Sequence, residues 1–143
     1  MGATVTAYWP GISVNQIESQ PGFYNDDKAW GNWMANLEEH EEVLEAMKRL
    51  NVSALCTFKT DGVEDDDVAW VTPSELERAA LRLRELVLAG HPDTNRILEI
   101  YAESANGIDP VNEEFARDLA DIAALAAFAT REGASRMTLE VNW

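Results

Sequence analysis

Clustered carboxylates are the side chains whose type and spacing could most directly do chemistry in this chain. The 143 residues include 26 acidic and 11 basic side chains, for a net charge of −15. Much of the excess lies in two acidic runs, the first at residues 38–45 and the second at residues 61–67. We expect these runs to attract cations or basic proteins and to repel phosphate backbones and anionic membrane surfaces. The predicted partner-binding residues are Glu38, Glu39, Glu41, Glu42, Asp61, Glu64, Asp65, Asp66 and Asp67.

Aromatic side chains near the N-terminus form a second candidate site, because they stand close to carboxylates. Large rings with a few convergent carboxylates suit a cationic or sugar-like ligand. The alternative is that such rings belong to the core, which we expect for Trp30 and Trp33 because they fall on the apolar face of a predicted helix. The alternative ligand pocket comprises Tyr8, Trp9, Tyr24, Asp26 and Asp27.

Patterns typical of nucleophilic catalysis do not occur. Ser13 lies in Gly-Ile-Ser-Val-Asn, which lacks the second glycine of a nucleophile elbow. Cys56 lies among apolar neighbours and is expected to be a buried, inert thiol. His40, within a run of glutamates, and His91, beside a proline, are expected to be ordinary surface residues. We therefore predict no catalytic residue, and the sequence favours a non-enzymatic protein.

Motifs for metals, cofactors and nucleic acids are also absent from the sequence. Zinc needs several His or Cys ligands, and the chain has two His and one Cys. No Gly-rich phosphate cradle occurs, so we predict neither a cofactor nor a metal. Calcium stays open for the acidic loop at residues 61–67, although the spacing of an EF-hand is missing. Three arginines of one predicted helix are interleaved with three glutamates, which indicates a salt-bridged solvent face instead of a nucleic-acid surface. They are Arg78, Arg82 and Arg84, with Glu75, Glu77 and Glu85.

Three stretches are predicted to be strands. Residues 3–9 are rich in β-branched and aromatic side chains and end at Pro10-Gly11. Residues 53–59 are nearly continuously apolar, as expected for a strand covered on both faces. Residues 136–143 alternate between apolar and polar side chains, which predicts one buried face and an exposed edge that could pair with a second copy.

Four helices are predicted between these strands. Apolar spacing indicates one long helix from Asn25 or Asp26 to Leu50, preceded by a looser stretch at residues 12–22. Thr72-Pro73-Ser74-Glu75 is a capping signal for a helix that ends at Gly90. The other two helices are expected at residues 93–104 and from Asp109-Pro110 to Gly133, and the last is apolar all round in its second half.

The order strand, helix, strand, three helices, strand predicts an α/β or α+β fold. It is expected to be a helix-dominated single domain spanning residues 1–143, with a small sheet of about three strands. A sheet packed by helices fits better than a bundle or a sandwich, because the two long connections are helical.

The leading functional hypothesis is a non-enzymatic acidic domain that binds a basic protein, with no nucleic-acid or membrane partner. In size and acidity the chain resembles bacterial immunity or inhibitor proteins, which neutralise basic nucleases with carboxylates; the resemblance assigns no residues. The alternative is a small-ligand-binding protein or enzyme that uses the aromatic pocket. A single cysteine and the lack of an export signal predict a cytoplasmic protein. A homodimer is a further expectation, with the acidic runs outside the contact.

Overall fold

Three short strands form the sheet, in an order that differs from their order in the chain. The structure is a computed structural model and describes residues 4–23, 39–60, 62–104 and 111–142. Strand β3 (Thr138–Asn142) lies between β1 (Thr4–Tyr8), its antiparallel neighbour, and β2 (Phe58–Thr60), its parallel neighbour. A parallel pair needs a long crossover, and here the connection between β2 and β3 is helical. The predicted helix-dominated fold with a three-stranded sheet is confirmed.

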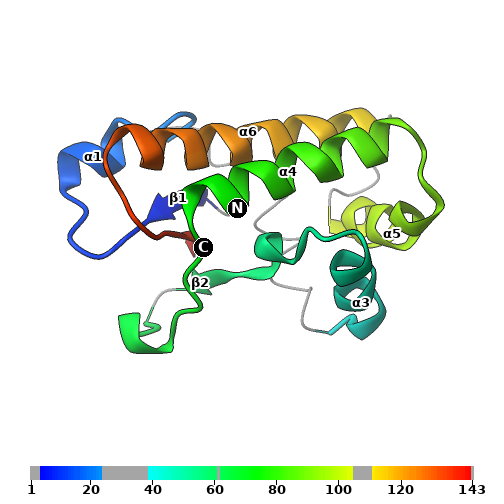
Figure 1. Cartoon of the computed structure of the whole chain (residues 1–143), viewed down its shortest axis with the longest axis horizontal. Coiled ribbons are helices and arrows are strands. Elements are labelled where there is room, and N and C mark those ends of the chain that lie inside the picture. The colour runs from blue at the N-terminus through cyan, green and yellow to red at the C-terminus, as the bar shows by residue number, and fades with distance from the viewer. Residues whose placement is uncertain (1–3, 24–38, 61, 105–110, 143) are drawn as a thin grey trace.

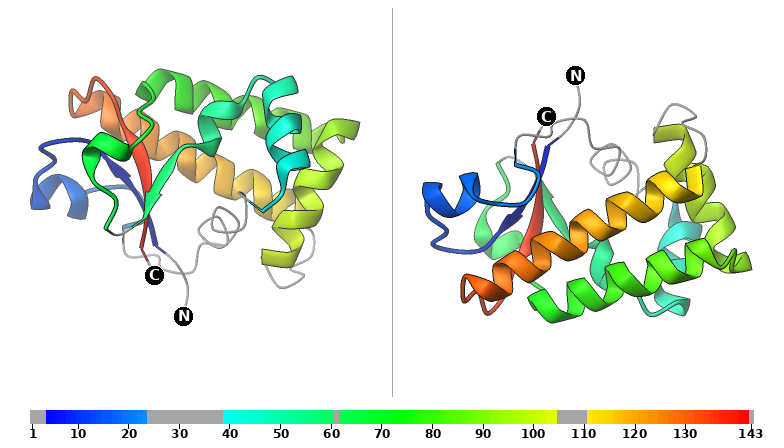
Figure 2. Two further views of the ribbon diagram at one scale, coloured as in Figure 1. Left: turned by 90° about the horizontal axis from the view of Figure 1, so that it is seen from below. Right: turned by 90° about the horizontal axis from the view of Figure 1, so that it is seen from above.

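Two long helices form a layer to which the other elements attach. Helices α4 (Pro73–Leu88) and α6 (Val111–Arg131) lie side by side along the long axis of the molecule (Figures 1 and 2). The sheet lies beneath one end of this pair, next to α1 (Val14–Glu18). Beneath the other end lie α3 (Glu41–Arg49) and α5 (Asn95–Ser104).

The ends of α4 follow from its sequence as predicted. Thr72 is the N-cap, and its Oγ1 accepts a hydrogen bond from the Glu75 backbone N–H at 3.2 Å. Pro73 occupies the first helical position, where a missing N–H costs nothing. After the last turn, Gly90 adopts φ 71°, a left-handed conformation that stops the helix.

One hydrophobic core joins the helices to one face of the sheet. One apolar face of α6 is buried throughout, from Phe115 to Ala129. Because side chains alternate along a strand, Val5, Leu139 and Val141 point into this core while Lys59 and Glu140 lie on the opposite face. Thr138 and Glu140 are also largely covered, so the prediction that β3 has only one buried face is wrong.

The helix predicted to run continuously to Leu50 is interrupted. Residues 25–38, with Trp30 and Trp33, lie outside the described residues. Glu39 and His40 are not helical, and α3 begins only at Glu41. The charges explain the new start, since Glu41 and Glu42 in the first turn and Lys48 and Arg49 in the last complement the helix dipole.

Two further predictions about local structure need correction. Residues 53–59 are not one strand, because Ser53–Cys56 forms a 3-10 turn and only the last part continues into β2. The stretch at residues 12–22 is not merely loose, because it contains α1. Ser13 and Gln16 form a capping box there, with the Gln16 backbone N–H donating to Ser13 Oγ at 3.2 Å and the Ser13 backbone N–H donating to Gln16 Oε1 at 2.8 Å.

Strand β3 is not an exposed edge, which overturns the predicted route to a dimer. Both of its sides are paired, one with β1 and the other with β2. The outer side of β1 is also covered at Ala7. The Ala7 backbone N–H donates to Gln20 Oε1 at 2.7 Å, and Gln20 Nε2 donates to the Ala7 carbonyl at 2.8 Å. The buried Gln20 amide thus takes the place of a neighbouring strand at this position.

Candidate functional site

The second acidic run folds into a single tight turn on the surface. We define the acidic turn as residues 64–67, in which Glu64 is the N-cap and Asp65–Asp67 forms one 3-10 turn. All four side chains are exposed. Glu64, Asp66 and Asp67 form no ion pair with any other described residue, so their charges are available to a partner. Asp61, which the sequence placed in the same run, lies outside the described residues.

Two hydrogen bonds fix this turn to the polar face of the sheet. The Tyr8 hydroxyl donates to Asp65 Oδ1 at 2.8 Å, and Lys59 Nζ donates to the Val63 carbonyl at 3.2 Å. The hydrogen bond to Asp65 raises the pKa of Tyr8, with burial adding to the effect, so the hydroxyl stays a donor at neutral pH. The turn is therefore anchored by β1 and β2 together.

Lys59 is a buried cation beneath the turn, only 8% exposed. Its Nζ lies 3.2 Å from Glu140 Oε2 on the neighbouring strand β3 and 4.9 Å from the centre of the Tyr8 ring. Glu140 offsets the lysine charge, and the ring face adds a cation–π contact. Because Glu140 balances the charge of Lys59, this lysine does not compensate the negative charge of the acidic turn.

Two stacked rings between two cations extend this anchored region. The Trp70 ring stacks on Tyr8 with 6.0 Å between centroids, and the Arg136 guanidinium lies 4.8 Å from the centre of the Trp70 ring. Together with Lys59, the order across the sheet is Arg136, Trp70, Tyr8, Lys59. These contacts with Trp70 and Lys59 hold the Tyr8 ring, and so help to position its hydroxyl.

A shallow hollow lies between the turn and the sheet. Its volume is about 310 Å³, and it is lined by Tyr8, Lys59, Val63, Glu64, Asp65 and Asp66. Three of the six lining side chains are carboxylates from the predicted partner-binding run, and one is the aromatic ring from the alternative pocket. The structure thus brings together members of two candidate sites that the sequence had kept apart.

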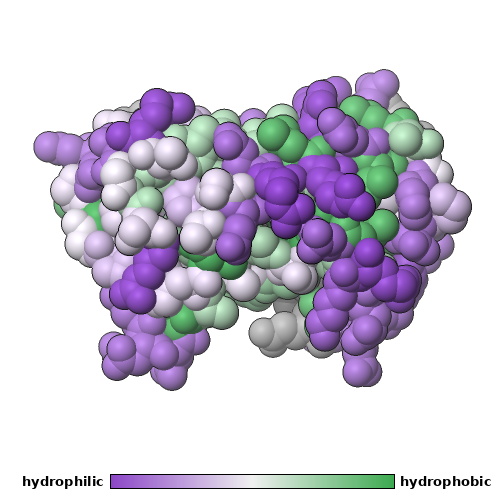
Figure 3. Space-filling view, viewed as in Figure 1, coloured by the Kyte–Doolittle hydropathy of each residue, from purple (hydrophilic) through white to green (hydrophobic). Residues whose placement is uncertain are grey.

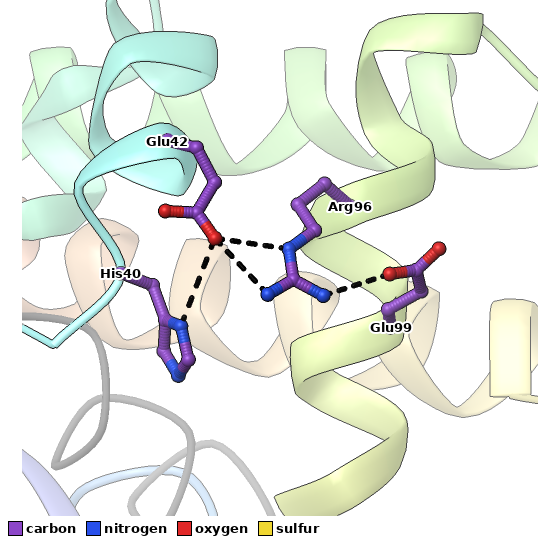
Figure 4. Close-up of polar contacts among 4 residues, drawn as sticks. All are labelled: His40, Glu42, Arg96 and Glu99. Carbon is purple, nitrogen blue, oxygen red and sulfur yellow. Dashed lines mark hydrogen bonds and ion pairs between the residues drawn. The ribbon is translucent and has the colours of Figure 1, made fainter.

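The first acidic run differs because two of its glutamates, Glu42 and Glu45, form ion pairs. Arg96 on α5 donates to Glu42 Oε1 from Nε at 3.1 Å and to Glu99 Oε2 from Nη1 at 2.8 Å, and His40 Nδ1 lies 3.9 Å from the same Glu42 oxygen (Figure 4). The pKa of Glu42 is lowered, chiefly by a backbone hydrogen bond and then by Arg96. These contacts join α3 to α5 and leave this run with less free charge than the acidic turn. Glu45 also pairs, with Lys48 at 3.7 Å.

The two acidic runs are separate surfaces. The acidic turn and α3 project from the same side of the molecule at opposite ends, and Figure 3 shows two hydrophilic areas there, at the lower left and lower right. Glu39, Glu41 and Glu42 are exposed on the α3 side, whereas Glu38 lies outside the described residues. A single continuous acidic surface is therefore not formed by the described members of the two runs.

The aromatic pocket predicted near the N-terminus is placed only in part. Tyr8 joins the acidic turn, but Trp9 is 7% exposed and packs in the core against Phe128, with 6.3 Å between ring centroids. Trp9 directly follows β1, and successive side chains of an extended chain point to opposite faces, which explains why Tyr8 and Trp9 separate. Tyr24, Asp26 and Asp27 lie outside the described residues.

Cys56 is not activated as a nucleophile, and His91 has a structural role. Burial raises the pKa of the Cys56 thiol to about 11, so almost none of it is thiolate at neutral pH. His91 Nδ1 accepts a hydrogen bond from the Asp93 backbone N–H at 3.1 Å and caps the 3-10 turn Pro92–Thr94. His40 precedes the first turn of α3.

Reasoning from the sequence missed Lys59, Trp70, Arg136 and Glu140, which hold the site in place. The only signal in the sequence was a charged residue inside each of two apolar stretches, at Lys59 and Glu140. Buried charges need opposite partners, but pairing these two requires knowing that β2 and β3 are neighbours. Trp70 and Arg136 carry no local signal of their position.

Among the described residues, no group of three or more His, Cys, Asp or Glu side chains is arranged to hold a metal ion. In the same part of the chain, no helix is both long and apolar enough to cross a membrane. Comparison of the chain with protein-family models, with curated proteins and with solved structures gives no match.

Proposed function

We propose that this protein is a non-enzymatic interaction domain whose acidic turn binds a basic surface of a partner protein. The observation that carries the proposal is the anchored turn, in which Tyr8 binds the Asp65 carboxylate and Lys59 binds the Val63 carbonyl. Glu64, Asp66 and Asp67 stay exposed and unpaired within the described structure. A surface held in place before binding loses little conformational entropy when it binds. Carboxylates on such a surface steer and align a basic partner.

The acidic turn supports this proposal better than α3 does. Binding through Glu42 would compete with its ion pair to Arg96, whereas the turn has no such internal competitor among the described residues. We therefore assign the contact to the turn and a long-range steering role to Glu38, Glu39, Glu41 and Glu42. The overall charge of −15 opposes nucleic acids and anionic membranes as alternative partners.

An inhibitor or immunity-type role is the form of this function that we favour. A basic enzyme, such as a nuclease with a cationic substrate groove, would present the positive surface that the turn complements. The hollow beside the turn has room for one Lys or Arg side chain of such a partner. The free thiol of Cys56 suits a reducing compartment, so we place the protein in the cytoplasm.

A small cationic ligand is the second candidate, because the same hollow combines the Tyr8 ring with carboxylates of the turn. This alternative uses Asp65 and Asp66 in place of the Asp26 and Asp27 predicted from the sequence. Titration calorimetry with free arginine and spermidine distinguishes the two candidates. Saturable binding of either ligand supports the small-ligand alternative, and its absence favours a protein partner.

Capture at two salt concentrations tests the leading proposal. Immobilised protein is incubated with a lysate of the cells that produce it, at about 0.05 M and about 0.5 M salt, because screening weakens exposed charge pairs at the higher value. We expect a basic protein to be retained at low salt by the wild type and lost from the variant Glu64→Gln, Asp66→Asn, Asp67→Asn. Equal retention by both proteins, or no basic protein at either salt concentration, would contradict the proposal.

A further inference from the structure

Helix α4 exposes two large apolar side chains. Leu81 is 43% exposed and Leu88 is 50% exposed, and both belong to the few large hydrophobic residues on the described surface. In the right-hand view of Figure 2, α4 and α6 lie nearest to the viewer, and no other described element covers them. A hollow of about 260 Å³ lies beside Leu88 and is also lined by Arg84, Glu113, Ala116, Arg117 and Ala120.

Two unpaired charges flank the exposed leucine. Glu77 and Arg84 are each half-buried, and neither forms an ion pair or a hydrogen bond with another described residue. The Arg84 Nε–H is buried without an acceptor. A partly buried charge that lacks an opposite partner is stabilised when such a partner is supplied. Both charges would gain from an opposite charge supplied from outside.

The spacing of these residues is self-complementary. Glu77, Leu81, Arg84 and Leu88 fall within about 60° of arc on the helix at 100° per residue, so they share one face. Two copies of this face, related by a two-fold axis near Leu81, place Arg84 of each copy opposite Glu77 of the other. The two reciprocal ion pairs lie about 10 Å apart along the helix, with Leu81 between them.

The distribution of charge permits this contact despite the acidity of the chain. Helix α4 carries three arginines and three glutamates, so it is neutral as a whole. The acidic turn and α3 project from the other side of the molecule (Figure 1). The two acidic regions therefore lie away from a contact that is made through α4.

From these contacts and charges, we propose that α4 is the contact surface for a second copy of this chain, in a symmetric dimer with reciprocal pairs between Arg84 and Glu77 around Leu81. An isologous contact needs one surface that is complementary to itself, which this face provides. The dimer carries two acidic turns that point away from the contact. The proposal is independent of the function assigned to the turn.

Charge reversal followed by restoration tests the proposed dimer. Sedimentation equilibrium is measured over about a hundredfold range of protein concentration, since the dimer fraction follows mass action. We expect Arg84→Glu and Glu77→Arg each to raise the dissociation constant at least about tenfold, because like charges then meet across the axis. The double variant Arg84→Glu, Glu77→Arg should restore the wild-type value to within about threefold, because both pairs are re-formed with reversed sign.

Two controls keep the outcome decisive. Glu103→Arg makes the same charge change on an exposed part of α5 and should leave the dimer intact. Val14→Ser removes an exposed apolar side chain elsewhere and should also have no effect, whereas Leu81→Ser should weaken the dimer. A monomeric wild type at all concentrations, or a double variant no better than the single ones, would overturn the proposal.

Discussion

Replacing Gln20 with Ala should lower the free energy of unfolding by about 3 kcal/mol, because it leaves two buried backbone groups without partners. The Gln20 amide both accepts from the Ala7 N–H and donates to the Ala7 carbonyl, and Ala7 is 1% exposed. Each group deprived of its hydrogen bond costs about 1 to 3 kcal/mol, since water does not reach it. Urea unfolding followed by tryptophan fluorescence measures the change.

Gln16→Ala is the matched control for this prediction. It removes the same kind of side chain from the capping box of α1, where the partner Ser13 is exposed. We expect a loss of about 1 kcal/mol, as is usual for a helix cap. Similar losses for Gln20→Ala and Gln16→Ala would show that the Gln20 amide does not act as a substitute strand.

Tyr101→Phe should cost about 2 kcal/mol near neutral pH, because it removes a hydrogen bond to a buried carboxylate. Tyr101 on α5 is fully buried, and its hydroxyl donates to Asp118 Oδ2 on α6. The ring packs edge to face on Phe115 with 4.5 Å between centroids, a contact that phenylalanine keeps. Unfolding in urea at pH 7 should therefore report mainly the lost hydroxyl.

The pH dependence gives this prediction a second signature. Burial, and then the hydrogen bond to Asp118, raise the pKa of Tyr101 in the folded state well above its ordinary value of 10.0. The stabilisation is therefore complete below the unfolded pKa and is lost as pH rises above it. The difference between wild type and Tyr101→Phe should shrink by up to about 1.4 kcal/mol per pH unit above pH 10. A difference that stays constant from pH 8 to about pH 11 would contradict the assigned titration.

Local signals in the sequence were sufficient for several elements. The capping residues Thr72 and Pro73 and the stop at Gly90 correctly place α4, because such signals depend only on neighbouring residues. The apolar run in the second half of α6 agrees with its burial, because Ile122, Leu125 and Ala126 are at most 1% exposed.

Features that depend on contacts distant in the chain could not be derived this way. The alternation at Thr138–Asn142 indicates a strand, but its central position depends on pairing with residues more than 70 positions away. The candidate site has the same origin, since the hydrogen bond from Tyr8 to Asp65 spans 57 residues. Composition pointed to the carboxylates of the acidic turn, and only the three-dimensional structure shows what anchors them.

We expect the acidic turn itself to be the contact surface for the basic partner, and not merely the net charge of the chain to attract it. Two triple variants separate these explanations at equal net charge. One carries Glu64→Lys, Asp66→Lys and Asp67→Lys in the turn, and the other carries Glu39→Lys, Glu41→Lys and Glu45→Lys at α3. Both sets of side chains are exposed, so neither variant should perturb the core.

The dissociation constant of each variant with the captured basic partner, measured by titration calorimetry, is the most direct test. We expect the turn variant to bind at least about tenfold more weakly than the wild type, because contact charges are reversed. The α3 variant should stay within about threefold, because its charges act only at long range and are screened by salt. Equal weakening by both variants would show that net charge alone drives binding, and would contradict a specific role for the acidic turn.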